Sequence, residues 1–211
     1  MQVDENFWSL QQASLVHGKG SLLIKATVQE AKKGLFTLSS KIDMKNLDAK
    51  KIMGELNNFG LKAFTSKNIQ GTLSLKSDLS LNLTKKGDFD LNSLQGKAGF
   101  SVKNGALVDF DPIKNLEVFL FKKRDFGDIK FAEIKDDISF KKGEITIGRM
   151  EINSSVLTLF VEGIYGPKNT DISIQVPLSN LKNRKNYQPE NIGVNKAGGL
   201  SEFLRARADD S

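Results

Sequence analysis

The chain has 211 residues, with 31 Lys and Arg against 25 Asp and Glu, which gives a formal net charge of +6. It contains no cysteine and one histidine, so disulfides, zinc–thiolate sites and cysteine nucleophiles are excluded and histidine-based triads are disfavoured. The basic balance fits an anionic partner, either nucleic acid or a lipid headgroup surface, and does not choose between them. No stretch reaches the roughly 18 to 20 apolar residues of a membrane-spanning helix. The first nine residues do not resemble a signal peptide, and we expect the chain to be an excised piece of a longer protein.

Apolar residues at every second position predict strands along most of the chain. In chain order the alternating sets are Leu22, Ile24, Ala26 and Val28; Phe36, Leu38 and Ile42; Leu73, Leu75, Leu79, Leu81 and Leu83; Ala98, Phe100 and Val102; Ala106, Val108 and Phe110; Ile138 and Phe140; Ile145 and Ile147; Leu157, Leu159 and Val161; and Ile172, Ile174, Val176 and Leu178. Hairpin turns are predicted at Asn104-Gly105 and Lys142-Gly143. We expect about ten to thirteen strands, antiparallel because the connections are short.

Two segments have helical rather than alternating spacing. In residues 48–59 the apolar residues are Ile52, Met53, Leu56 and Phe59, and Asp48 is the expected N-cap. In residues 111–121 the N-cap is Asp111, Pro112 takes the first helical position, and Ile113, Leu116, Phe119 and Leu120 form one stripe. The fold class predicted is therefore mainly β, an extended and curved antiparallel sheet forming a groove or half-barrel, with two short helices.

The C-terminal part has a different composition. Residues 182–199 are polar and include the Gly198-Gly199 pair, which indicates a loop. Residues 200–211 form a terminal element, a strand or a short helix. Residues 1–181 are expected to make a single β-rich domain. Within it there is a weak internal echo, since Ile69-Gln70-Gly71 and Leu94-Gln95-Gly96 both open a strand.

The acidic residues and the histidine have structural explanations. The close carboxylate pairs are Asp88 and Asp90, Asp109 and Asp111, and Asp136 and Asp137. A pair on one strand face is able to perform acid–base chemistry, but Asp88 and Asp136 fall where turns are expected and Asp111 is a cap. His17 lies beside Gly18-Lys19-Gly20, which lacks the spacing of a phosphate-binding loop, and is expected at the surface.

The basic clusters do not form a nucleic-acid site. They fall in expected turns or helix ends, and none contains either of the two tyrosines or the tryptophan. Nucleic-acid binding favours a continuous basic stripe interleaved with aromatic residues. The apolar strand faces raise a different question, because two short helices cover only a few strands. The remaining strands must form a second sheet, close on themselves or hold an apolar ligand.

Residues 94–181 carry a pattern that resembles the AsmA-like C-terminal region of bacterial envelope proteins, in a form like that of Bacteroidetes members. The matching runs are Leu94-Gln95-Gly96, Val102-Lys103-Asn104-Gly105-Ala106-Leu107, Asp109-Phe110-Asp111-Pro112-Ile113, Ile129-Lys130-Phe131-Ala132, residues 138–147, Met150-Glu151-Ile152-Asn153-Ser154-Ser155, residues 157–163 and residues 172–181. The resemblance extends less specifically back to about residue 43.

This resemblance implies a non-enzymatic protein of the AsmA/TamB type. Such proteins are anchored in the inner membrane by an N-terminal helix, which this chain lacks, and extend an apolar β-groove across the periplasm. The implied role is to shield phospholipid acyl chains during transport to the outer membrane, in support of outer membrane biogenesis. The implied location is the periplasm, and the implied partners are phospholipid and envelope proteins. The resemblance supplies no catalytic residue, metal or cofactor.

The expected lipid-contacting residues are the alternating apolar ones. They are Leu73, Leu75, Leu79, Leu81, Leu83, Phe100, Val102, Ile145, Ile147, Leu157, Leu159, Ile172, Ile174 and Val176. We expect no catalytic residue, metal ligand or cofactor. One alternative is a structural scaffold of the cell envelope that binds proteins and has fully packed β faces. Another is a glycan-active enzyme, which needs two acids converging in a cleft.

Overall fold

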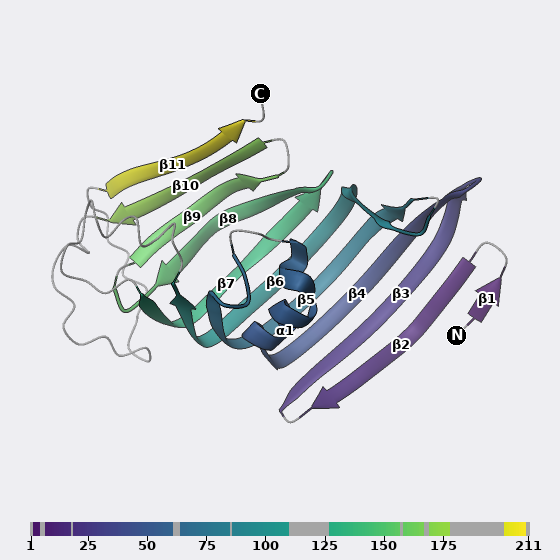
Figure 1. Ribbon diagram of the computed structural model, residues 1–211, viewed down its shortest axis with the longest axis horizontal. Coiled ribbons are helices and arrows are strands. Elements are labelled where there is room, and N and C mark those ends of the chain that lie inside the picture. Colours follow the sequence, from purple (N-terminus) through teal and green to yellow (C-terminus); the bar gives the residue numbers. More distant parts are fainter. Residues whose placement is uncertain are drawn as a thin grey trace.

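The described residues of the chain form one open antiparallel sheet of eleven strands, shown in Figure 1. The computed structural model describes residues 2–4, 7–17, 19–60, 64–84, 86–109, 127–156, 158–166, 169–177 and 201–209. The strands are β1 (Gln2–Asp4), β2 (Phe7–His17), β3 (Gly20–Lys32), β4 (Leu35–Asp48), β5 (Ile69–Leu83), β6 (Phe89–Val108), β7 (Asp128–Lys141), β8 (Glu144–Asn153), β9 (Thr158–Tyr165), β10 (Asn169–Pro177) and β11 (Ser201–Asp209). Their order in the sheet is their order in the sequence. The prediction of a mainly β, antiparallel chain is confirmed.

One α-helix occurs in the described residues, α1 (Ala49–Glu55), between β4 and β5. Asp48 is its N-cap as predicted, because the Asp48 carboxylate accepts a hydrogen bond of 2.8 Å from the Lys51 backbone N–H. No helix in this part of the chain is long and apolar enough to cross a membrane.

The helix is shorter than the predicted range of residues 48–59. A 3-10 turn, η1 (Asn57–Gly60), follows it, and Asn57 and Asn58 have φ angles of 48° and 53°. Two consecutive residues in the left-handed region end an α-helix. The second predicted helix, residues 111–121, lies outside the described residues, as does the predicted polar loop at 182–199. The predicted terminal element is strand β11, which pairs with β10.

Replacing the N-cap tests how much the short helix depends on it. The Asp48→Ala variant is expected to lose about 1 kcal/mol of unfolding free energy, because the first-turn N–H groups lose their acceptor. Urea denaturation followed by circular dichroism measures the change. Lys50→Ala is the control, because Lys50 is exposed in the same turn and caps nothing. Equal stabilities of Asp48→Ala and Lys50→Ala would contradict the assignment.

The predicted hairpin at Asn104-Gly105 is wrong, because both residues lie inside the 20-residue strand β6. Asn104 does adopt the left-handed φ of 49°, but it does so in a bulge where β6 shifts register against Gln70 and Thr72 of β5. An Asn-Gly pair favours positive φ in a bulge as well as in a turn. The hairpin predicted at Lys142-Gly143 is confirmed, since it joins β7 to β8.

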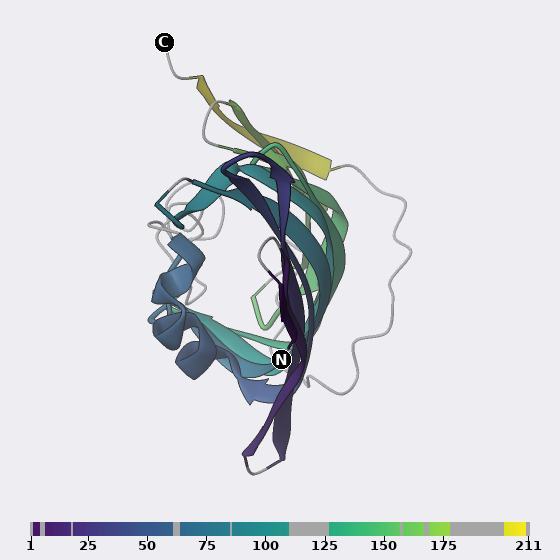
Figure 2. The same cartoon turned by 90° about the vertical axis from the view of Figure 1, so that its right-hand side faces the viewer.

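The sheet is strongly curved, and α1 lies on its concave side (Figure 2). A buried core lies where the helix meets the strands. Its residues are Ala49, Met53, Ile69, Leu73, Val102, Leu107, Ile129, Phe131, Ile134, Ile152, Val156, Leu159 and Val176. Ala49 and Met53 of α1 therefore pack on the same surface as Leu73 and Val102 of the sheet. The concave side is the one that the helix covers.

Candidate functional site

The strand register separates apolar from polar side chains. Residues directly opposite each other in an antiparallel pair point to the same face, and so do alternate residues along a strand. Leu73 lies opposite Val102 and Leu75 opposite Phe100. Ile134 of β7 lies opposite Val102 in turn. The alternating residues of β5, β6 and β7 therefore share one face, which we call the apolar face.

The apolar face extends over the neighbouring strands on both sides. Toward β4, Leu79, Leu81 and Leu83 lie opposite Ser40, Leu38 and Phe36. Toward β8, Ile147 lies opposite Ile138, which lies opposite Ala98. Beyond a bulge in β8, the row continues through the opposed pairs Met150 and Val161, then Val161 and Ile174.

The structure brings together every described lipid-contacting candidate on this face. These are Leu73, Leu75, Leu79, Leu81, Leu83, Phe100, Val102, Ile145, Ile147, Leu159, Ile172, Ile174 and Val176. Leu157 lies outside the described residues. Because α1 packs against Leu73 and Val102, the apolar face is the concave one.

Cover over the apolar face is uneven in the described part of the chain. Leu73, Val102, Leu159 and Val176 are buried and belong to the core beside α1. The other nine candidates are only partly buried, including the whole row from Leu79 to Leu83. At the β2 edge, Leu10 and Leu15 are 40 % and 62 % exposed. The face thus has a packed end under the helix and a half-exposed remainder.

Several residues of this face were not among the sequence-predicted candidates. Trp8 of β2 packs on Phe36 of β4, with ring centroids 5.4 Å apart. Val28 of β3, opposite both Trp8 and Leu38, lies between them in the sheet. The signal for β2 was hidden because a bulge between Leu10 and Ala13 interrupts its alternation. The alternating apolar residues of β3 and β4 were the sequence signal that the apolar face extends toward β2.

Polar side chains interrupt the apolar face at Ser77 and Asp136 as well as at Ser40. Ser77 lies between Ile42 and Ala98, and Asp136 lies opposite Phe100. The Ser77 hydroxyl and one Asp136 carboxylate oxygen are buried and have no hydrogen-bond partner within the described structure. They are hydrogen-bonding groups in an otherwise hydrocarbon-like surface.

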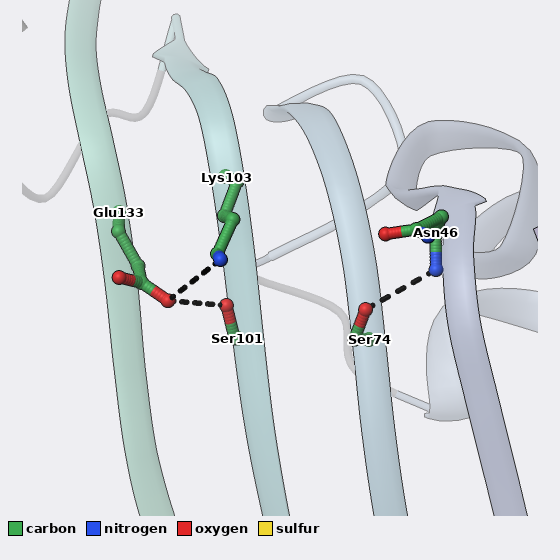
Figure 3. Close-up of polar contacts among 5 residues, drawn as sticks. All are labelled: Asn46, Ser74, Ser101, Lys103 and Glu133. Carbon is green, nitrogen blue, oxygen red and sulfur yellow. Dashed lines mark hydrogen bonds and ion pairs between the residues drawn. The ribbon is translucent and has the colours of Figure 1, made fainter.

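The convex face is polar, and its side chains hydrogen-bond across strands (Figure 3). The Glu133 carboxylate of β7 accepts a hydrogen bond of 2.8 Å from the Ser101 hydroxyl of β6 and lies 3.8 Å from the Lys103 ammonium. In β4, the Asn46 backbone N–H donates to the Ser74 hydroxyl of β5 at 3.1 Å. The Ser101–Glu133 hydrogen bond is partly buried and the Asn46–Ser74 one is exposed. The Lys103–Glu133 ion pair at the surface contributes little stability.

A shallow pocket of about 650 Å³ lies on the polar face, where none was predicted. Eight of its twelve lining residues belong to that face: Asp43, Lys45, Ser74, Lys76, Gly99, Ser101, Lys135 and Asp137. Gly99 contributes no side chain, and the Asp137 carboxylate lies over it. Three lysines and three aspartates line the pocket, Asp136 being the third aspartate, so their formal charges offset each other.

The carboxylate pairs do not converge in the described structure. Asp136 was expected in a turn, but that prediction is wrong, because it lies inside β7. Asp136 and Asp137 are adjacent strand residues and point to opposite faces. Asp88 lies in the turn before β6, as predicted, where its backbone N–H donates to the Thr84 hydroxyl at 3.1 Å. His17 is the last residue of β2, opposite Gly20.

The described residues contain no group of three or more His, Cys, Asp or Glu side chains placed to hold a metal ion. The distinguishing feature is instead the apolar concave face, whose chemistry suits a hydrocarbon ligand rather than a polar substrate. Comparison with protein-family models, with curated proteins and with solved structures returns no match to this chain.

Proposed function

We propose that this chain is a non-enzymatic lipid-handling domain that shelters phospholipid acyl chains against its apolar concave face. The observation that carries the proposal is the combination of curvature and incomplete cover. Nine of the lipid-contacting candidates are partly exposed on the concave side of an open sheet. Large exposed apolar surfaces of soluble domains are typical of sites that bind a partner or ligand.

The chemistry of the face favours acyl chains. Each methylene buried against it contributes about 0.8 kcal/mol, so two acyl chains bind without any specific polar contact. On β5, Leu75 lies opposite Phe100 of β6, and Leu81 and Leu83 lie opposite Leu38 and Phe36 of β4. All six side chains are partly buried. These strands offer a continuous surface rather than a closed pocket. The headgroups remain in water at the open side of the sheet.

The proposed setting follows from the resemblance to the AsmA-like region. We place the domain in the periplasm, in a protein anchored in the inner membrane, where it supports lipid transport to the outer membrane. The packed end under α1 and the half-exposed remainder then have different roles. The first stabilises the curved sheet, and the second contacts lipid.

The direct test is extraction of lipid from the purified protein. Native mass spectrometry of the chain produced in a bacterial host is expected to show phospholipid-sized adducts, and solvent extraction followed by lipid mass spectrometry identifies them. Delipidated protein is then titrated with phosphatidylglycerol and phosphatidylethanolamine carrying a fluorescent acyl chain. A chain that carries no lipid and takes up neither probe would overturn the proposal in favour of a protein-binding scaffold.

Two substitutions on the apolar face test where the lipid lies. Leu79→Asp places a charge in the partly buried row of β5, and Phe100→Asp places one on β6, where Phe100 packs against the core. Both are expected to reduce bound lipid about tenfold or more, because the carboxylate loses its hydration against an acyl chain. Ser80→Asp is the matched control, since Ser80 is adjacent to Leu79 but points to the polar face opposite Ser39. Circular dichroism confirms that each variant is folded. Equal lipid content in Leu79→Asp and Ser80→Asp would contradict the assigned face.

A further inference from the structure

The edge of the sheet at β2 is open along most of its length. The three-residue strand β1 pairs only with Phe7, Trp8 and Ser9. From Leu10 to Val16, the side of β2 away from β3 has no partner strand in the part of the chain that the structure describes. Leu15 and Val16 are 62 % and 75 % exposed and point to opposite faces. Each face of this edge therefore carries an exposed apolar side chain.

The composition of β2 differs from that of the opposite edge. Its sequence, FWSLQQASLVH, contains no Asp, Glu, Lys, Arg or Pro. The other edge strand, β11, carries Glu202, Arg205, Arg207 and Asp209 within nine residues. Charged residues and proline on an edge strand block pairing with further strands, and their absence leaves the backbone N–H and C=O groups available.

We propose that two copies of this chain associate through β2, antiparallel about a two-fold axis at Ser14. In that register Ala13 lies opposite Leu15 and Gln12 opposite Val16 of the second copy. Odd-numbered residues meet odd-numbered ones, so Ala13 and Leu15 of both copies remain on the apolar face. The two sheets then join into one, with both apolar faces on the same side.

Three features favour a second copy of this chain over another partner at this edge. The pairing covers residues 12–16 and leaves β1 in place at residues 7–9. It brings no charged side chains opposite each other, although each chain carries a net charge of +6. An isologous contact also closes after two copies, so it buries the exposed edge without forming a filament. The inference stands independently of lipid binding.

The chain has no cysteine, which makes a single-cysteine test specific. Directly opposed residues of an antiparallel pair have Cβ atoms about 4.5–5.5 Å apart, close to the separation that a disulfide bridges. Ser14→Cys is therefore expected to form a covalent dimer under mild oxidation within minutes. Ser39→Cys is the control, because Ser39 is also exposed but lies on the inner strand β4.

Light scattering of the wild-type chain measures the association without a cross-link. The mass is expected to rise toward the dimer with concentration, and Leu15→Lys is expected to hold it at the monomer, because two lysines would flank the axis. Circular dichroism checks that Leu15→Lys is folded. A wild-type chain that stays monomeric, or Ser14→Cys cross-linking no faster than Ser39→Cys, overturns the proposal and assigns the edge to a strand of another polypeptide.

Discussion

Replacing Phe131 with alanine is expected to lower the free energy of unfolding by about 3–5 kcal/mol. Phe131 is 1 % exposed and belongs to the core beside α1. Its ring lies directly over Gly105 of β6, where no side chain is available to fill the space that alanine would leave. The cost therefore combines lost burial with a cavity. Urea denaturation of both proteins, analysed with a common m-value, measures it.

The control for Phe131→Ala is Phe89→Ala at the start of β6. Phe89 is 63 % exposed, so its truncation is expected to change stability by less than about 0.5 kcal/mol. A loss below about 1 kcal/mol for Phe131→Ala would contradict the packed core. This comparison also distinguishes the buried core from the remainder of the apolar face. The core is expected to stabilise the fold whether or not lipid is present.

Replacing Gly96 with alanine is expected to cost about 2–5 kcal/mol, from backbone strain and steric overlap together. Gly96 has a φ of 135°, which L-residues rarely adopt, and an added Cβ would lie 2.9 Å from the Leu79 Cα and closer still to the Asp78 carbonyl oxygen. Both obstacles are main-chain atoms of β5, so no side-chain rotation relieves them. Thermal and urea denaturation measure the loss.

Two other glycines separate these causes. Gly34 has a φ of 75° but open space around it, so Gly34→Ala carries only the conformational cost of about 1–2 kcal/mol. Gly148 has an ordinary φ, and its added Cβ would meet Asp136 at 3.7 Å, so Gly148→Ala is expected to be nearly neutral. If Gly96→Ala were no worse than Gly34→Ala, the close approach of β5 and β6 would be refuted.

The alternating pattern predicted the strands well because each strand has one apolar and one polar face. Leu73 to Leu83 and their partners needed no long-range information, since the polar residues between them could only face water. The neighbour-to-neighbour order also followed from short turns such as Lys142-Gly143. The echo between Gln70-Gly71 and Gln95-Gly96 has a physical basis, because both glycines have φ near 130°, at 129° and 135°.

Features that depend on neighbouring strands were not predictable in this way. Asn104 shows the limit, since its left-handed φ suits a bulge or a turn equally and only pairing with β5 decides between them. Asp136 was expected in a turn, and its place inside β7 on the apolar face follows only from its pairing with Phe100 of β6. The uneven cover of the apolar face depends on where α1 lies, which no local pattern encodes.

The sequential strand order has a consequence for how such a chain changes length. In the part of the chain that the structure describes, every strand pairs only with strands next to it in the sequence. A hairpin inserted at any turn would widen the sheet by two strands, about 10 Å. The order of the other strands would stay the same. The width of the apolar surface therefore depends on the number of hairpins. Duplication or deletion of a short coding segment changes that width in fixed steps.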